Sequence, residues 1–243
     1  MRFQIIIGLS LIALSALFYF THYLMFGDPH HIFIYLVGDI AFVPIEVLLV
    51  TMILHKLLED REKKNKLKKL NMIIETFFSE MGMRILKSFS DADSDLDAMR
   101  KDLLVKNSWT SSDFKRAEKN LKDHIFKVEI RKIDLNYMHD YLVGKRGFLL
   151  RLLQNPVMLE HETFTDVLRA LSHLTEELSS REDLGNISDT DYEHLAGDVQ
   201  RAYDRLVNQW INYMAYLKMD YPYLFSLAVR TNPFDENAKA AVE

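Results

Sequence analysis

Residues 31–51 are an apolar stretch, HIFIYLVGDIAFVPIEVLLVT, that is long enough to cross a bilayer and yet contains Asp39 and Glu46 without any lysine or arginine. A carboxylate near the middle of a membrane helix costs on the order of 2.5–3.5 kcal/mol on insertion scales. The two acids lie seven residues apart, so a helix places them on one face, two turns from each other. Any fold proposed for this chain has to give these two side chains a partner, water or a bound cation.

A second long apolar run, Phe3–Phe26, precedes this stretch and has Arg2 alone in front of it. Its apolar core is longer than that of a signal peptide, and no small-residue cleavage motif follows, so we expect an uncleaved first span. Residues 27–31 then form a short polar turn. A link this short predicts an antiparallel transmembrane hairpin with both ends on the same side.

Charge predicts which side that is. The turn at residues 27–31 carries no lysine or arginine, whereas the chain after the second span is strongly basic, with Lys56, Arg61, Lys63, Lys64, Lys66, Lys68 and Lys69. The positive-inside rule therefore predicts an external turn and cytoplasmic termini. We expect the membrane to be the plasma membrane of a prokaryote. The basic cluster also suits contact with anionic lipid headgroups, although a topology signal is the simpler interpretation.

Composition excludes several classes of function. The formal net charge of the 243 residues is -5, which argues against a nucleic-acid partner. Cysteine is absent, which excludes a disulfide framework, thiolate chemistry and a cysteine-based zinc site. No run alternates as a strand does, and we therefore predict an all-α integral membrane protein.

The predicted organisation follows the chain in order. We expect transmembrane helix 1 at 1–26, the external turn at 27–31 and transmembrane helix 2 at 32–54. A juxtamembrane stalk helix at 55–87, an acidic connector at 88–107, a cytoplasmic helical bundle at 108–230 and a polar tail at 231–243 follow. The stalk shows a broken coiled-coil pattern, which favours self-association, at Leu57, Leu67, Ile74, Phe78, Met81 and Ile85.

Several helix starts in the bundle have capping signals. Thr110 with Asp113 predicts a capping box, and Trp109 can pack on Phe114 across it. Asn155 before Pro156 predicts a second start, Thr163 with Asp166 another, and Ser188 with Asp191 opens a long helix to about residue 218. Residues 144–147, GKRG, are expected to break the helical pattern.

Four patterns resemble known sites, and for each the structural explanation is preferred. His139-Asp140, with His124 upstream, resembles the metal-binding dipeptide of HD-type phosphohydrolases, but the resemblance covers only two adjacent residues. GKRG resembles the phosphate-clamping loop of KH domains, but this sequence lacks the β-strands of such a domain. The acidic run Asp91, Asp93, Asp95 and Asp97 lacks the glycine and glutamate of an EF-hand. Fragments of a dicarboxylate metal bundle occur as His173-x-x-Glu176 and Asp191-x-x-His194, while Glu160, Glu162 and Asp198 are interpreted as exposed charges. We predict no catalytic residues, metal site or cofactor.

Two arrangements satisfy the acids of the second span. Within one hairpin, Tyr19 or His22 lies near Asp39, whereas Glu46 has at best one hydroxyl at its level. In a homo-oligomer the two acids instead face a central axis and form carboxylate rings, with Tyr35 and Gly38 on the same side of the helix. Pro44, two residues before Glu46, cannot donate a backbone hydrogen bond and so leaves the carbonyl of Ile40 free.

The leading hypothesis is accordingly a homo-oligomeric, cation-conducting or ion-sensing membrane protein. The alternative is a non-conducting anchor or scaffold that presents the helical domain to a cytoplasmic protein partner.

Overall fold

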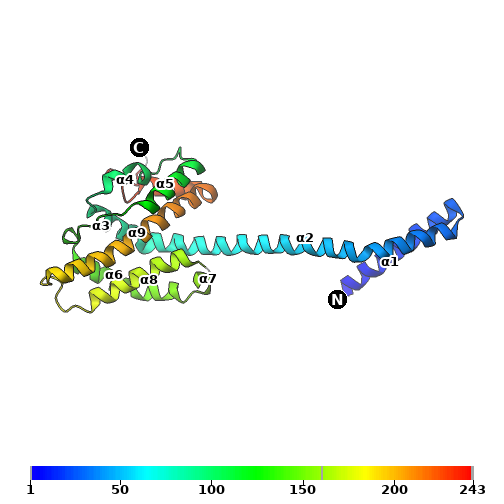
Figure 1. Cartoon of the computed structure of the whole chain (residues 1–243), viewed down its shortest axis with the longest axis horizontal. Helices are drawn as coiled ribbons and strands as arrows, with labels where there is room; N and C mark the ends of the chain where they lie inside the picture. Colours follow the sequence, from blue (N-terminus) through cyan, green and yellow to red (C-terminus); the bar gives the residue numbers. More distant parts are fainter. Residues whose placement is uncertain (1, 160, 242–243) are drawn as a thin grey trace. The chain divides into compact units, whose positions relative to one another are not determined.

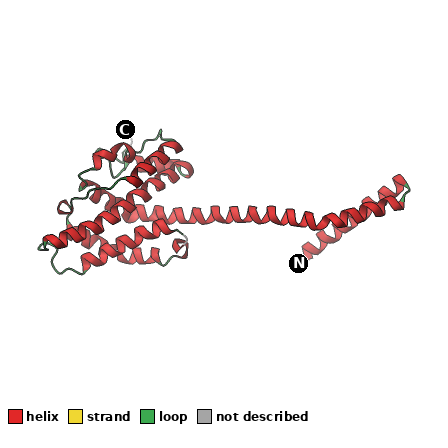
Figure 2. Cartoon of the chain, viewed as in Figure 1, coloured by secondary structure: helices red, strands yellow, loops and turns green. Residues whose placement is uncertain are grey.

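The computed structural model describes residues 2–159 and 161–241, and within them every regular element is a helix (Figure 2). In chain order the elements are α1 (Arg2–Phe26), α2 (Pro29–Phe77), the π-helical turn η1 (Phe78–Gly82), α3 (Met83–Asp91), α4 (Leu96–Leu103), α5 (Ser111–Asp123), the 3₁₀ turn η2 (Ile130–Lys132), α6 (Leu135–Leu153), α7 (Pro156–Leu159), α8 (Glu162–Ser179), α9 (Asp189–Asp220) and α10 (Pro222–Arg230) (Figure 1). The predicted all-α class is confirmed. The chain divides into two compact units, residues 1–64 and 65–243.

The first unit is a helical hairpin with a tight turn. Gly27 adopts a left-handed φ of 63°, and its N–H donates to the carbonyl of Tyr23 at 2.9 Å, which ends α1. Asp28 Oδ1 then accepts hydrogen bonds from the backbone N–H groups of His30 (2.9 Å) and His31 (3.3 Å), and Pro29 occupies the first position of α2. The turn is shorter than the expected 27–31, because Pro29 already starts α2 and only Gly27 and Asp28 lie between the two helices.

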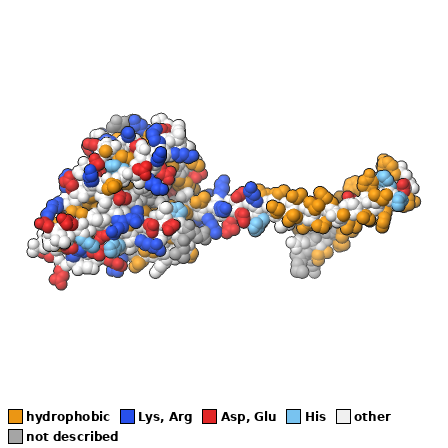
Figure 3. Space-filling view, in the orientation of Figure 1, with side chains coloured by type: hydrophobic (Ala, Val, Ile, Leu, Met, Phe, Trp, Pro, Cys, Tyr) orange, Lys and Arg blue, Asp and Glu red, His pale blue; other side chains and the backbone are white. Residues whose placement is uncertain are grey.

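The apolar side chains of this hairpin are exposed. Both helices are long and apolar enough to cross a membrane by length and composition, and in the most apolar window of each 0% of the residues are buried. Helices α1 and α2 make few contacts with each other, and apolar side chains cover the face of both in Figure 3. Apolar surface of this extent is unfavourable in water, so a partner other than water is needed to cover it.

The second unit has its own hydrophobic core. Helix α9 contacts α3, α5, α8 and α10, and α8 packs between α9 and α6. The last turns of α2 belong to this core, because Phe77 packs edge-on against Phe164 of α8, and the next residue, Phe78, stacks on Tyr213 of α9. Buried apolar residues run from Leu70 to Phe234.

The predicted caps are largely confirmed. The side chain of Asp113 accepts the N–H of Thr110 at 2.8 Å in a complete capping box, and the rings of Trp109 and Phe114 meet with centroids 5.1 Å apart. Asn155 Oδ1 caps α7, which starts at Pro156, and Ser188 caps α9. Helix α8, however, starts at Glu162 with His161 as its cap, where Thr163 was expected.

Three segments of the second unit differ from what the sequence predicted. Residues 144–147 lie inside the continuous helix α6, because a glycine on a solvent-exposed helix face costs only about 1 kcal/mol and α6 is held by packing on α8. The segment 88–107 is not a free connector, since it contains α4 and buries Met99 and Leu103. The start of the tail is also buried: Asn232 Nδ2 donates to the carbonyl of Leu103 at 2.8 Å.

The heptad positions of the stalk are used within the chain. Ile74, Phe78, Met81 and Ile85 are all buried in the core of the second unit, which leaves Leu57 and Leu67 of that pattern exposed. The C-terminal half of the apolar pattern is therefore explained by packing within the chain. Gly82 has a packing role there, because a Cβ atom on it would lie 2.7 Å from the ring of Phe78.

Because the core of the second unit lies within residues 70–234, we expect a chain of residues 65–243 to fold without the hairpin. It should unfold in one cooperative thermal transition by circular dichroism, with the blue-shifted fluorescence of buried tryptophan, since Trp210 is fully buried. A matched chain of residues 83–243 lacks Phe77, Phe78 and Met81 and should be markedly less stable. Non-cooperative melting of the longer chain would contradict an independent core.

Candidate functional site

In the hairpin, Asp39 has a partner. Tyr19 Oη donates a hydrogen bond to Asp39 Oδ2 at 3.3 Å, which is the contact expected from the folding back of the chain. His22 does not pair with Asp39 among the described contacts. Its ring instead lies parallel to that of His31 at 6.4 Å, and His31 meets Tyr35 edge-on at 4.8 Å.

These polar groups line a cavity between α1 and α2. The cavity has a volume of about 760 Å³, and its walls combine Tyr19, His22, His31, Tyr35 and Asp39 with apolar side chains of both helices. A partly polar groove of this kind accommodates a lipid tail, a further helix or water. Its polar groups gather towards the turn end of the hairpin.

Glu46 is placed differently from Asp39. It is exposed and makes no hydrogen bond or ion pair within the residues that the structure describes. Pro44 lies in the interior of α2. A Cβ atom on Gly38 would meet nothing within 4 Å, so no close approach of α1 requires a glycine there. The five basic residues Lys63, Lys64, Lys66, Lys68 and Lys69 are exposed along α2. Glu46 is thus the acid of this span that its own hairpin does not satisfy.

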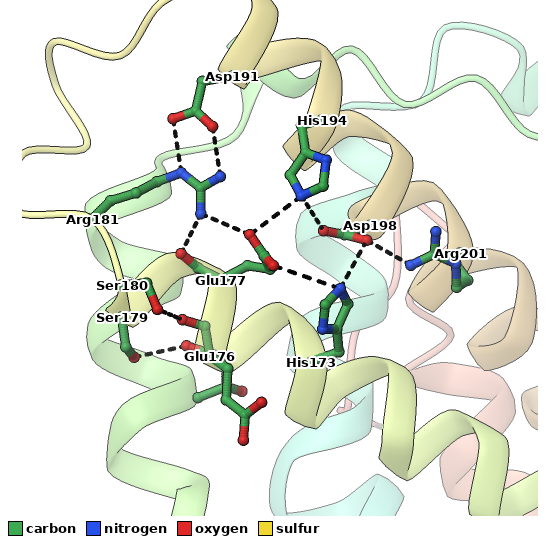
Figure 4. A network of polar contacts seen from close by, with 11 residues as sticks. His173, Glu176, Glu177, Ser179, Ser180, Arg181, Asp191, His194, Asp198 and Arg201 are labelled. Carbon is green, nitrogen blue, oxygen red and sulfur yellow. Dashed lines mark hydrogen bonds and ion pairs between the residues drawn. The ribbon is translucent and has the colours of Figure 1, made fainter.

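A second polar constellation lies between α8 and α9 in the helical bundle (Figure 4). His173 and Glu177 are four residues apart on α8, and His194 and Asp198 are four residues apart on α9. Residues at this spacing share a helix face, and the apolar residues beside them bury the two helices against each other. Packing therefore brings two histidine–carboxylate pairs together.

The contacts run between the helices as well as along them. His173 Nε2 lies 3.4 Å from Asp198 Oδ1 and 3.8 Å from Glu177 Oε1. His194 Nε2 lies 3.3 Å from Glu177 Oε2 and 3.5 Å from Asp198 Oδ2. We call these four residues the α8–α9 cluster. Each imidazole thus faces both carboxylates.

Two arginines hold the carboxylates in place. Arg181 makes a bidentate pair with Asp191, at 2.8 and 2.6 Å, and also donates to Glu177 at 3.0 Å. These hydrogen bonds from Arg181 lower the pKa of Glu177 and that of Asp191. Arg201 Nη1 donates to Asp198 Oδ1 at 2.5 Å. The arginines leave one oxygen of Asp198 without a hydrogen bond, and that oxygen is buried.

The sequence patterns pointed to this region but paired the wrong residues. Glu176, three residues after His173, is exposed, and Asp191 is bound by Arg181. Glu162 is exposed at the start of α8 as expected, and Glu160 lies outside the described residues. Asp198, also expected to be an exposed charge, is instead buried where α9 packs on α8. The signal that identifies the cluster is a histidine followed four residues later by a carboxylate, repeated on two successive helices.

The other sequence candidates remain apart from this cluster. His139 contacts its neighbour Asp140 at 2.9 Å, while the ring of His124 packs on Phe126 at 4.7 Å. Lys145 of the GKRG segment pairs with Glu80 at 3.0 Å. In the acidic run, the carboxylates contact basic side chains or backbone N–H groups, as in the 2.7 Å pair of Asp91 with Lys87. These contacts agree with the structural explanations preferred for the three patterns.

The fold defines a class of two-part helical proteins, with an apolar helical hairpin at the N-terminus and a helical domain after it. The chain belongs to the MJ1433 family. Residues 1–58 match the family model described as "MJ1433, N-terminal helical domain", and residues 66–230 match "Uncharacterized protein MJ1433, C-terminal helical domain". The division between the two models agrees with the division of the structure after residue 64.

A curated relative supports the same assignment. The chain is 43% identical over 237 residues to "Uncharacterized protein MJ1433" of Methanocaldococcus jannaschii, a match that covers 98% of this chain and 95% of the relative. No solved structure matches the chain.

The ion pair of Arg181 with Asp191 predicts a pH-dependent contribution to stability. Because the folded pKa of Asp191 lies below its usual 3.8, its charged form stabilises the fold above about pH 4, and this stabilisation is lost as the pH falls through the folded pKa. Asp191→Asn should therefore lower the melting temperature of the full chain in detergent near neutral pH, and the difference from wild type should shrink as the pH falls below 3.8 towards the folded pKa. Circular dichroism melts near neutral pH and at an acid pH well below 3.8 measure this.

Asp189→Asn is the matched control, since Asp189 also lies in the first turn of α9 but pairs with the exposed Arg131. Its effect should be small at both pH values. An equal loss in the two variants would assign the effect to the helix terminus and not to Arg181.

Proposed function

We propose that this protein is a membrane-anchored helical domain, held by its N-terminal hairpin at the cytoplasmic face of the plasma membrane and presented there to a protein partner. The observation that carries the proposal is the complete exposure of the most apolar windows of α1 and α2 in a chain whose other apolar residues mostly form a core. Lipid is the environment that covers a helix which is apolar on all sides.

Charge supports the orientation. Residues 27–31, the turn and the start of α2, have no lysine or arginine, whereas the basic cluster Lys63, Lys64, Lys66, Lys68 and Lys69 follows the apolar part of α2. The positive-inside rule then places the turn outside and both termini in the cytoplasm. Helix α2 runs without interruption from Pro29 to Phe77, so the anchor and the first buried residues of the helical domain share one helix.

The internal bond of Asp39 favours an anchor over a conducting pore. Asp39 Oδ2 accepts a hydrogen bond from Tyr19 of its own hairpin at 3.3 Å, so this carboxylate is satisfied in part without an ion or a second copy. Of the two acids that motivated the hypothesis of an ion path, one therefore has a partner within a single chain.

Glu46 supports a second candidate function, a homo-oligomer with a cation path. It is exposed on the apolar part of α2 without a partner in the described chain. A ring of such residues about a hydrated axis attracts cations, and copies packed around that axis would also cover apolar surface of the helices.

Topology is the direct test of the anchor. The sequence contains no cysteine, so single cysteines introduced at the exposed positions His30 and Ser108 are labelled without background. In intact cells a membrane-impermeant maleimide should label His30→Cys, whereas Ser108→Cys should react only after permeabilisation. The unaltered chain is the control for background labelling.

Labelling of both positions in intact cells would contradict the proposed orientation. Release of the chain by alkaline carbonate would contradict an integral anchor. A purified chain whose mass lacks the first helix would show that α1 is a cleaved signal sequence.

The second candidate makes a separate prediction for the two acids. In reconstituted vesicles Glu46→Gln should abolish cation flux, whereas Asp39→Asn should retain a substantial part of it, because asparagine still accepts the hydrogen bond from Tyr19. Asp60→Asn, an exposed acid beyond the apolar part of α2, is the control and should conduct as wild type does. Absence of flux through the wild-type protein would eliminate the ion path and leave the anchor.

A further inference from the structure

We propose that the α8–α9 cluster, His173, Glu177, His194 and Asp198, is a binding site for one divalent transition-metal ion such as Zn²⁺. The site lies within the second unit, so it does not depend on the membrane topology proposed above. Its two halves have the same design, a histidine and a carboxylate four residues apart on one helix.

The separations of the ligand atoms fit a tetrahedral ion. Bonds of about 2.0–2.1 Å from zinc to imidazole nitrogen or carboxylate oxygen imply distances of about 3.3–3.4 Å between neighbouring ligand atoms. His173 Nε2 contacts Glu177 Oε1 at 3.8 Å and Asp198 Oδ1 at 3.4 Å, and one ligand atom from each of His173, Glu177 and Asp198 lies within 4.8 Å of the others. His194 Nε2 faces the second oxygen of each carboxylate, Glu177 Oε2 at 3.3 Å and Asp198 Oδ2 at 3.5 Å, so the carboxylates have to rotate for all four residues to share one ion. Small side-chain movements bring such a set into coordination distance.

Burial of Asp198 gives an independent indication of a missing cation. Its side chain is 3% exposed, and Oδ2 is buried without a hydrogen bond, while Arg201 binds Oδ1. A buried carboxylate oxygen without a partner is costly, and a metal ion removes that cost. Oδ2 lies 3.5 Å from His194 Nε2, so the unsatisfied oxygen is inside the cluster.

The surroundings suit a metal in two further ways. Arg181 and Arg201 hold Glu177 and Asp198 from outside, as the outer hydrogen bonds of metal-binding carboxylates do. His173 and His194 are 47% and 55% exposed, which leaves a path for the ion from solvent.

The donor set indicates the class of metal. Imidazole nitrogen favours zinc, iron, nickel and copper over magnesium and calcium, and mixed nitrogen and oxygen ligands in a tetrahedral arrangement suit Zn²⁺. Four protein ligands leave no open position, which is typical of a structural site. The ion would join α8 to α9 on one side of the loop at residues 180–188 and so couple the stability of the bundle to metal supply.

The competing explanation is a metal-free ion-pair network in which both histidines are protonated. The same nitrogen–oxygen separations fit that network. The two explanations differ in whether the folded chain takes up one metal ion per molecule at neutral pH.

The test uses the full chain, purified in detergent and stripped with a chelator. Titration with Co²⁺ should give the intense visible absorption of tetrahedral cobalt at one equivalent, and Zn²⁺ should displace it. His173→Gln and His194→Gln should each weaken Zn²⁺ binding by at least about 100-fold, since loss of an outer-shell partner alone costs about 10–100-fold. Zn²⁺ should raise the melting temperature of wild type and not that of these variants.

His139→Gln is the matched control, because His139 also contacts a carboxylate, Asp140, but lies outside the cluster. This variant should bind as wild type does. Both ligand histidines are partly exposed, so their replacement should leave the fold intact, as circular dichroism will show. A wild-type chain that takes up neither ion, or equal weakening in His139→Gln, would overturn the proposal in favour of the ion-pair network.

Discussion

The structure depends on where its apolar side chains are covered. From Leu70 to Phe234 most of them are covered by the chain itself, whereas along α1 and the first half of α2 they are exposed. At about 25 cal/mol per Å² of apolar surface, a hairpin of this length in water would be opposed by a large free energy. One helix, α2, therefore has exposed apolar side chains along its first half and buried ones in its last turns. The change falls where the lysines and acids of residues 55–69 interrupt the apolar sequence.

That division explains why the two acids of the second apolar stretch differ in what they imply. Asp39 lies close enough to the turn for the returning helix to offer Tyr19. Glu46 lies two turns further from it, where the hydroxyl of Ser10 is hydrogen-bonded to backbone carbonyls of its own helix. A hairpin whose helices make few contacts satisfies a polar group near its turn and leaves one further along to lipid, water or another copy.

Local signals predicted much of the fold. Caps such as Thr110 with Asp113 and Asn155 with Pro156 were readable because each depends on a few consecutive residues. The segment 88–107 was misread because its acidic surface hides Met99 and Leu103, which are buried only through contacts with distant helices. GKRG was expected to break a helix because glycine propensity is a weak local preference that packing on α8 overrides.

The α8–α9 cluster shows the same limit for a functional site. The sequence showed the two histidines, but their carboxylate partners depend on which face of each helix packs against the other helix. The carboxylates four residues after each histidine, Glu177 and Asp198, point across the interface, and those three residues away do not.

Outside the cluster, Arg181 bridges the end of α8 to Asp191 at the start of α9 and so fixes how the two helices are aligned. Because this ion pair and the apolar interface already set the alignment, the four ligands are held near one another before any ion arrives. The ordering cost of assembling the site is then met by the folding of the bundle, and the charge of the metal acts on carboxylates that are already in place.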